Sequence, residues 1–205
     1  MSLPEEYLSF LRQRRSIRSF TSDPIDEETI LRMVEMASWS PSAGNRQDWF
    51  FTIVMDMATK SAMADIVREC WEGIVAENQD LGIIDEVARY SSRFADFQQA
   101  PAVVVVSARK PDALQRHMLQ GAAEATVGGA ASAAMAAQNL MLAAHAMGVG
   151  SCCMTGAVAA REELARRIGL HAKQEIVCLI ALGRPATVPS PPSRKPISDI
   201  ARIIR

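Results

Sequence analysis

The chain has 205 residues, enough for one domain with a hydrophobic core, and 49% of them are hydrophobic. Lysine and arginine number 22 against 23 aspartate and glutamate residues, so the net charge of −1 favours neither nucleic acid nor a membrane surface as a partner. The four cysteines form no Cys-x-x-Cys pair and the three histidines are scattered, which argues against a zinc site and is typical of a reducing, cytoplasmic location.

The first third of the chain predicts two helices separated by a basic segment. Residues 4–13 are amphipathic, and "RQRRSIRSF" at 12–20 then places four arginines within nine residues. A second helix is expected to begin after Asp26, whose side chain is a good N-cap, and to end before Pro41. The residues "PSAGN" at 41–45 are typical of a loop.

The remainder alternates strands and helices. Strands are predicted at 49–55, 101–108 and 175–185, where β-branched and other apolar residues are concentrated. Residues 57–99 are expected to be helical in two or three pieces, 112–147 to form a long helix or two, and 161–170 a short one. "GVGSCCMTG" at 148–156 is interpreted as a glycine-punctuated turn, and four prolines mark the tail between 189 and 196. This order predicts a single α+β domain.

One long stretch could be mistaken for a membrane span, because no Asp, Glu, Lys or Arg occurs between Glu124 and Arg161. It is rich in alanine and glycine, so its hydrophobicity is modest and a membrane span is not expected. Two interpretations remain: an internal core helix, and a helix at an interface between subunits.

Three polar clusters stand out, although each has an ordinary alternative. Arg14, Ser16 and Arg18 would share a face in extended chain and could grip one anion, or the run could be a solvated charged surface. Ser42, Asn45 and Gln47 bring hydroxyl and amide groups into a loop that otherwise merely stops a helix. Arg194 and Lys195 are flanked by prolines. A nucleic-acid site is disfavoured because no aromatic-interleaved basic stripe continues the arginine cluster.

The familiar catalytic motifs are missing. The sequence contains no Gly-x-Gly-x-x-Gly after a strand, no Walker loop and no Gly-x-Ser-x-Gly elbow. Cys152, Cys153 and Cys178 lie in apolar sequence and are expected to be inert core thiols. No side chain is therefore assigned an acid–base role, and no metal ligand set is predicted.

Taken in order, these segments resemble the nitroreductase family of FMN enzymes. "RRSIRSF", a helix and "SPSAGNRQDWFF" are similar to the opening signature of that family. "QAPAVVVVSA" resembles its second core strand, "GVGSCCMTG" its Gly-rich segment, and "IVCLIALGRPA" with "RKPISDI" its last strand and C-terminal arm. The resemblance covers nearly the whole chain except residues 57–99.

The resemblance implies a mixed, mostly antiparallel sheet flanked by helices in an intertwined homodimer, with one domain over 1–205, a variable helical lid at 57–99 and an arm at 186–205. FMN would lie at the subunit interface. The residues that the resemblance assigns to it are Arg14, Arg15, Ser16, Arg18, Pro41, Ser42, Asn45, Gln47, Cys153, Met154, Thr155 and Arg194. Of these, the loop residues at 41–47 would come from the partner subunit.

The implied reaction is ping-pong hydride transfer from NADH or NADPH through the flavin to a small electron-poor acceptor, such as a nitroaromatic, a quinone or an enone. Alternatives on the same framework are reductive dehalogenation, dehydrogenation and flavin cleavage. A flavin-binding or redox-sensing module without turnover is a third hypothesis.

Two regions bear on the substrate. The lid offers four aromatic residues that would either stack on an aromatic substrate or pack its own small core: Trp71, Tyr90, Phe94 and Phe97. Three positions depart from the family pattern, since Asp48 replaces a proline, Arg184 an often aromatic residue and Cys153 a frequent tryptophan. Asp48 is expected near the flavin entrance, where its acid would repel anionic substrates. Arg184 is expected on the surface, with a third cation near the phosphate as the alternative.

Overall fold

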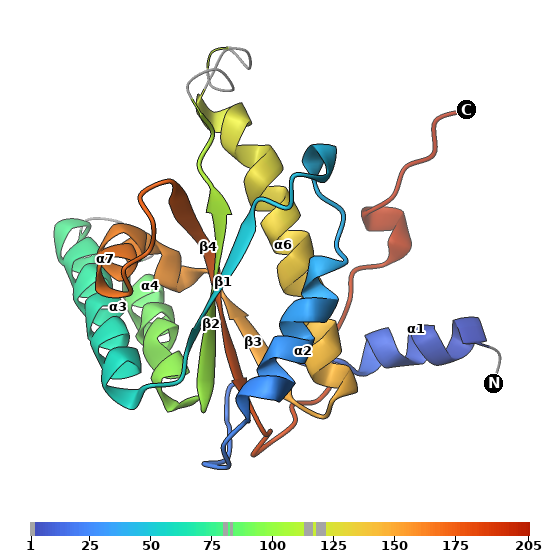
Figure 1. Ribbon diagram of the computed structural model, residues 1–205, viewed down its shortest axis with the longest axis horizontal. Coiled ribbons are helices and arrows are strands. Elements are labelled where there is room, and N and C mark those ends of the chain that lie inside the picture. Colours follow the sequence, from blue (N-terminus) through green and yellow to red (C-terminus); the bar gives the residue numbers. More distant parts are fainter. Residues whose placement is uncertain (1–2, 80–81, 83, 113–116, 118–121) are drawn as a thin grey trace.

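A four-stranded sheet forms the centre of the computed structural model, which describes residues 3–79, 82, 84–112, 117 and 122–205. The strands are β1 (Trp49–Val54), β2 (Ala102–Arg109), β3 (Gly150–Met154) and β4 (Gln174–Gly183), in the order β1-β2-β4-β3 with every pair antiparallel. Helices cover both faces of the sheet (Figure 1). The predicted α+β class and antiparallel character are confirmed.

The two inner strands are buried on both faces, as their continuous apolar sequence predicts. Side chains alternate along β2, so Val104 and Val106 enter one core cluster while Val103 and Val105 enter the other. All four valines are fully buried. The sheet therefore separates two hydrophobic cores, one beneath each helical layer.

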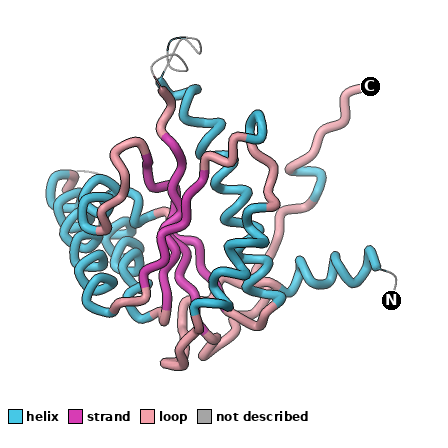
Figure 2. The backbone as a smooth tube through the Cα atoms, viewed as in Figure 1, coloured by secondary structure: helices cyan, strands magenta, loops and turns pink. Residues whose placement is uncertain are grey.

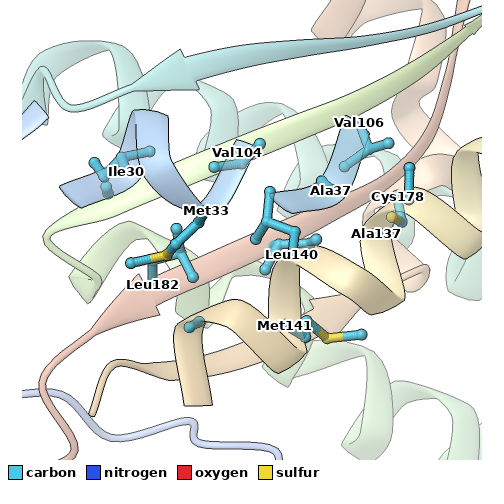
Figure 3. Packing of buried hydrophobic residues seen from close by; sticks show 14 of the residues in the cluster. Ile30, Met33, Ala37, Val104, Val106, Ala137, Leu140, Met141, Cys178 and Leu182 are labelled. Atoms are coloured by element: carbon cyan, nitrogen blue, oxygen red, sulfur yellow. The ribbon is translucent and has the colours of Figure 1, made fainter. Parts of the chain in front are cut away.

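The first layer consists of α2 (Glu27–Ser38) and α6 (Ala122–Ala146). Asp26 caps α2 by accepting a hydrogen bond from the Thr29 amide at 2.7 Å, which confirms the predicted start. Small side chains such as Ala133 and Ala136 let α6 lie close to the sheet, where Leu140 packs against Met33 of α2 (Figure 3). The prediction of an internal core helix is confirmed for this face of α6.

The second layer contains the segment predicted as a lid. It comprises α3 (Met57–Glu77), α4 (Ile84–Ser91) and the 3₁₀ segment η2 (Ser92–Gln99), accompanied by η3 (Gly156–Ala160) and α7 (Arg161–Arg167). Lys60 ties α3 to β2, because its buried ammonium donates to the carbonyls of Ala100 at 2.6 Å and Pro101 at 3.0 Å. Burial lowers the pKa of Lys60.

Two terminal segments leave the body of the domain. Helix α1 (Leu3–Gln13) projects from one side, and the chain after Pro185 runs outward near it with one short turn, η4 (Ile197–Asp199) (Figure 2). Every residue from 186 to 205 is exposed. Within the described part of the chain, none of the helices combines the length and the apolar character that crossing a bilayer would require.

The structure corrects the sequence prediction at one point. Residues 150–154, interpreted as part of a turn, form β3 at the edge of the sheet, because they pair with β4 although their small side chains have low strand propensity. The helix or pair of helices predicted over 112–147 is described as α6 from Ala122 and as helical at residue 117, whereas residues 113–116 and 118–121 lie outside the described residues.

Candidate functional site

The basic segment crosses the open edge of the sheet beside β3. Ser16 forms a parallel bridge with Ser151, and the Ile17 amide donates to the Ser151 carbonyl at 2.9 Å. Gly150 makes this close approach possible, because a Cβ there would lie 2.9 Å from the Ile17 side chain. Two sequence motifs 130 residues apart, "RRSIRSF" and "GVGSCC", are thus brought together.

The arginines of this segment divide between two cavities. Arg18 lines a cavity of about 440 Å³ together with the Cys152–Gly156 segment, whereas Arg14 and Arg15 line a smaller one of about 190 Å³ at the start of β3. Arg15 also donates to the carbonyls of Arg12 at 2.5 Å and Arg14 at 2.8 Å, so its charge stabilises the C-terminal end of α1.

The outer edge of β3 offers backbone hydrogen-bonding groups to the larger cavity. In an antiparallel strand, consecutive residues direct their amide and carbonyl groups to opposite sides. The Ser151 carbonyl faces outward, toward Ile17, so the groups of Cys153 face outward as well. Among the described residues, the isolated bridge at Ser16 is the pairing on this edge, and the edge beyond it carries no strand.

Two cysteines on neighbouring strands interact at this edge. Cys153 is exposed and Cys178 of β4 is buried. A hydrogen bond from the Cys178 thiol lowers the pKa of Cys153 to about 7, and the Arg14 charge acts in the same direction. The same hydrogen bond raises the pKa of Cys178. Since Cys153 is exposed, the expectation that all three thiols lie in the core is wrong for this residue.

Three of the four lid aromatics form one wall of the 440 Å³ cavity. The rings of Trp71 and Phe94 lie 4.9 Å apart, and Tyr90 meets Phe94 edge to face at 5.2 Å. Trp71 Nε1 donates to the Gly156 carbonyl at 2.9 Å, which attaches the wall to the end of β3. Phe97, by contrast, is 1% exposed and packs in the core beneath the sheet.

Arg93 is a cavity residue that the sequence did not single out. It lies between Ser92 and Phe94 in η2, and it lines both the 440 Å³ cavity and an adjoining one of about 620 Å³. Asp96 lies near both Arg93 and Arg18, and burial raises the pKa of its carboxyl against their opposing charges. A single arginine in a helical segment forms no motif, so the sequence offered no signal by which Arg93 could have been found.

The predicted 41–47 loop belongs to the first helical layer, where it follows α2 and contacts α6. It contains the short turn η1 (Ala43–Asn45), where Gly44, Asn45 and Gln47 have positive φ angles of 61°, 51° and 51°. The Gln47 amide donates to Ser42 Oγ at 3.0 Å, and Gln47 Nε2 to Asn45 Oδ1 at 3.3 Å. Pro41 is exposed beside it. The loop presents ordered amide groups to solvent.

Within one chain, this loop and the arginine segment do not meet. The Ala43 amide donates to Ser132 Oγ in the first half of α6, whereas His145 at the end of that helix borders the cavity of Arg14 and Arg15. The two points on α6 are about 20 Å apart at roughly 1.5 Å per residue.

The remaining predicted positions are placed as follows. Arg194 is exposed on the outgoing arm and donates to the adjacent Ser193 carbonyl at 3.2 Å, away from Arg14 and Arg18. Arg184 is exposed, as expected. Asp48 pairs with Arg46 at 3.0 Å, which neutralises the acid that was expected near the entrance. The described residues contain no cluster of His, Cys, Asp or Glu suited to a metal ion.

Comparison with known proteins places these features in a family. The family model described as "Nitroreductase family" matches residues 11–184. An NADH dehydrogenase of Thermus thermophilus is 31% identical over 92% of this chain and 91% of its own length. A 5,6-dimethylbenzimidazole synthase of Rhodospirillum rubrum is 44% identical over 57 residues, which are 28% of this chain and 27% of that protein.

Two solved structures share the fold. A BluB-like flavoprotein from Clostridium difficile superposes with a TM-score of 0.81 at 24% identity, over 100% of both chains. A nitroreductase with bound FMN from Desulfitobacterium hafniense superposes with a TM-score of 0.74 at 20% identity, over 97% of this chain and 98% of that one. With a family model matched from the arginine segment to the end of the last strand, the chain belongs to the nitroreductase family of flavin oxidoreductases.

Proposed function

We propose that the protein binds FMN along the open edge of β3 and transfers hydride from NADH or NADPH to a small electron-poor acceptor in a ping-pong reaction. The acceptor class would be a nitroaromatic, a quinone or an enone. The observation that carries the proposal is the 440 Å³ cavity, which is lined by both Arg18 and the outward edge of β3 at Cys153.

The residues present fit a flavin mononucleotide. The cavity volume is within the range of ordinary ligand sites, ~300–1,000 Å³. Flavin is planar and carries carbonyl and ring-nitrogen acceptors along one edge, and the amide of Cys153 and the guanidinium of Arg18 are donors suited to them. Arg14 lies four residues before Arg18 and lines the smaller cavity, where its guanidinium is suited to a phosphate.

The flavin, when bound, supplies the hydride chemistry, and the protein supplies binding, orientation and electrostatics. Arg18 would stabilise the negative charge that reduction places on the pyrimidine edge. The segment Cys153–Thr155 would fix the height of the ring above β3. Trp71 and Phe94 exclude water from one side of the cavity, because they pack on Gly156 and on each other.

We further infer a homodimer in which the 41–47 loop of the partner completes the site. The loop of one chain is separated from its own arginine segment by about half the length of α6, ~20 Å, so we do not expect one ligand to touch both within a chain. Large apolar side chains are also exposed on α1, at the end of α2 and along the arm, including Trp39 at 79% and Ile203 at 80%. Exposed apolar surface of this extent marks an interaction surface. Arg194 would reach the phosphate from that arm.

The proposal is tested by flavin content after matched substitutions. Arg18→Ala removes a charge-assisted hydrogen bond worth ~1.5–3 kcal/mol, so FMN affinity should fall at least tenfold. Arg12→Ala, on the exposed end of α1, should change FMN affinity by less than about twofold. Fluorescence titration of the apoprotein with FMN gives both constants. Equal affinities in the two variants would show that the arginine segment had been misassigned.

A second FMN reaction on the same framework is the next candidate, because the partial match to a 5,6-dimethylbenzimidazole synthase falls outside simple reductases. One experiment distinguishes a reductase from a flavin-cleaving enzyme: the holoprotein is reduced and then exposed to acceptor or to dioxygen. A reductase recovers its flavin unchanged in every cycle. Loss of intact FMN during turnover would assign flavin cleavage instead.

A further inference from the structure

The aromatic wall of the 440 Å³ cavity is a rigid surface for a planar ligand. Trp71 and Phe94 are half-buried and pack against each other, and the Trp71 hydrogen bond to Gly156 fixes the wall relative to β3. Gly156 lets the Phe94 ring approach so closely that a Cβ at that position would lie 2.3 Å from it. The wall is thus packed directly against the end of the Cys152–Gly156 segment, and both line the cavity.

The same cavity carries an excess of positive charge. Arg18 and Arg93 both line it, and none of its described lining residues is Asp or Glu. None of the ion pairs between described residues involves either arginine. Asp96 interacts electrostatically with both arginines without forming an ion pair with either. One carboxylate balances at most one of the two guanidinium groups.

The proposed function accounts for Arg18 but leaves Arg93 without a role. Arg93 comes from the lid rather than from the arginine segment, and it lies next to the aromatic wall through Phe94. Its guanidinium can donate two parallel hydrogen bonds to a carboxylate. A ligand that stacks on the wall would therefore present its substituent to this cation.

We propose that Arg93 recognises an anionic substituent on a planar aromatic acceptor held against Trp71, Tyr90 and Phe94. The substrate class is then aromatic carboxylates, or aromatic compounds with a comparable anionic group, rather than neutral aromatics. The identification of this ligand as the acceptor rests on the proposed function, whereas the anion site itself does not.

The test uses benzoate and benzamide, which have similar shape but differ in charge. Calorimetric titration of the protein, with and without bound FMN, should show benzoate binding about tenfold more tightly than benzamide. Arg93→Gln should abolish that difference, and Arg93→Lys should restore part of it. The matched control is Arg89→Gln on α4, since Arg89 lines the adjoining 620 Å³ cavity but not the 440 Å³ one. Added salt should weaken benzoate binding and leave benzamide binding unchanged.

Equal dissociation constants for the two ligands in the wild-type holoprotein would overturn the inference, as would an equal loss of benzoate affinity in Arg89→Gln. Its failure is distinguishable from failure of the proposed function. If the protein binds no FMN but still prefers benzoate through Arg93, the anion site stands and the flavin reaction falls. If the protein binds FMN but does not distinguish benzoate from benzamide, the anion site falls and the proposed flavin reaction stands.

Discussion

At the scale of single residues, neighbouring side chains give chemically similar groups different properties. Cys70, Cys152, Cys153 and Cys178 are all thiols, yet burial raises the pKa of Cys70 and of Cys152 while the hydrogen bond from Cys178 lowers that of Cys153 to about 7. Cys153 also borders the cavity and is the exposed one of the four thiols, so it is the cysteine at which the thiolate is most favoured.

This difference predicts selective alkylation of Cys153 in the apoprotein. A thiol with a pKa of about 7 is about half ionised at pH 7, against ~1% for a thiol at the ordinary value of 9.0. Its lower nucleophilicity offsets part of this gain, so iodoacetamide should modify Cys153 ~5–10-fold faster than Cys70. Mass spectrometry of timed digests measures all four rates in one sample.

The pH profile supplies the control. The alkylation rate at Cys153 should rise as pH increases through about 7, because the thiolate is the reactive form. Cys178→Ala removes the donor and should move the midpoint upward, toward 9.0. A wild-type midpoint already near 9, or unchanged in Cys178→Ala, would contradict the thiol–thiolate hydrogen bond.

At the scale of elements, close packing between the lid and the end of β3 shapes the cavity. Phe94 of η2 occupies the space where Gly156 has no side chain, and Trp71 of α3 bonds to the carbonyl of the same residue. Lys60 fixes the base of α3 to the start of β2. Helix α3 is therefore attached at two places: at Trp71 to the end of β3, and at Lys60 to the start of β2.

Gly156→Ala should destabilise the protein by ~1–3 kcal/mol, because the new methyl group would displace the Phe94 ring. Gly73→Ala is the matched control. Gly73 lies inside α3, and a methyl group added there would meet nothing within 4 Å, so alanine should stabilise the helix by ~0.5–1 kcal/mol. Urea unfolding at one fixed protein concentration measures both changes. Equal effects of the same sign would contradict the packing described.

At the scale of the whole molecule, the terminal segments expose apolar side chains that the proposed homodimer would cover. Helix α1 and the arm at 186–205 extend away from the domain, and they expose Tyr7, Ile197, Ile200, Ile203 and Ile204. Burying such side chains is worth ~1.5–3 kcal/mol each in the absence of other costs. A second copy of the chain would cover them and would bring its 41–47 loop to the flavin.

The homodimer predicts a particle of twice the 22.3 kDa chain mass in light scattering. Deletion of residues 187–205 removes four exposed isoleucines together with Arg194, so it should shift the mass toward the monomer and lower FMN retention. Arg194→Ala alone should lower FMN retention and leave the mass unchanged. A wild-type protein of monomer mass that binds FMN stoichiometrically would contradict the shared site.

The sequence predicts the features that depend on local composition, and it does not predict those that depend on contacts between distant segments. The strands around Phe51, Val104 and Ile180 are evident from local composition, because β-branched and aromatic side chains pack well on a sheet. The edge strand β3 is not, since Gly150 and Ser151 have low strand propensity and pair only through long-range contacts. The arginine segment and the 41–47 loop were found as motifs.

Other features of the site depend on contacts that no motif carries. The pKa of Cys153 follows from a side chain on the next strand, 25 positions away. Arg93 becomes a cavity residue only because η2 folds against the end of β3. The neutralisation of Asp48 requires the turn that brings Arg46 beside it. Such relations are set by tertiary packing rather than by spacing along the chain.

Anaerobic titration of the FMN-loaded protein with NADH and with NADPH tests the central claim most directly. The account predicts that one or both nicotinamides bleach the flavin absorbance stoichiometrically, and that an electron-poor aromatic acceptor then restores it faster than dioxygen does. A protein that stays colourless after FMN is added, or whose bound FMN neither nicotinamide reduces, would contradict it.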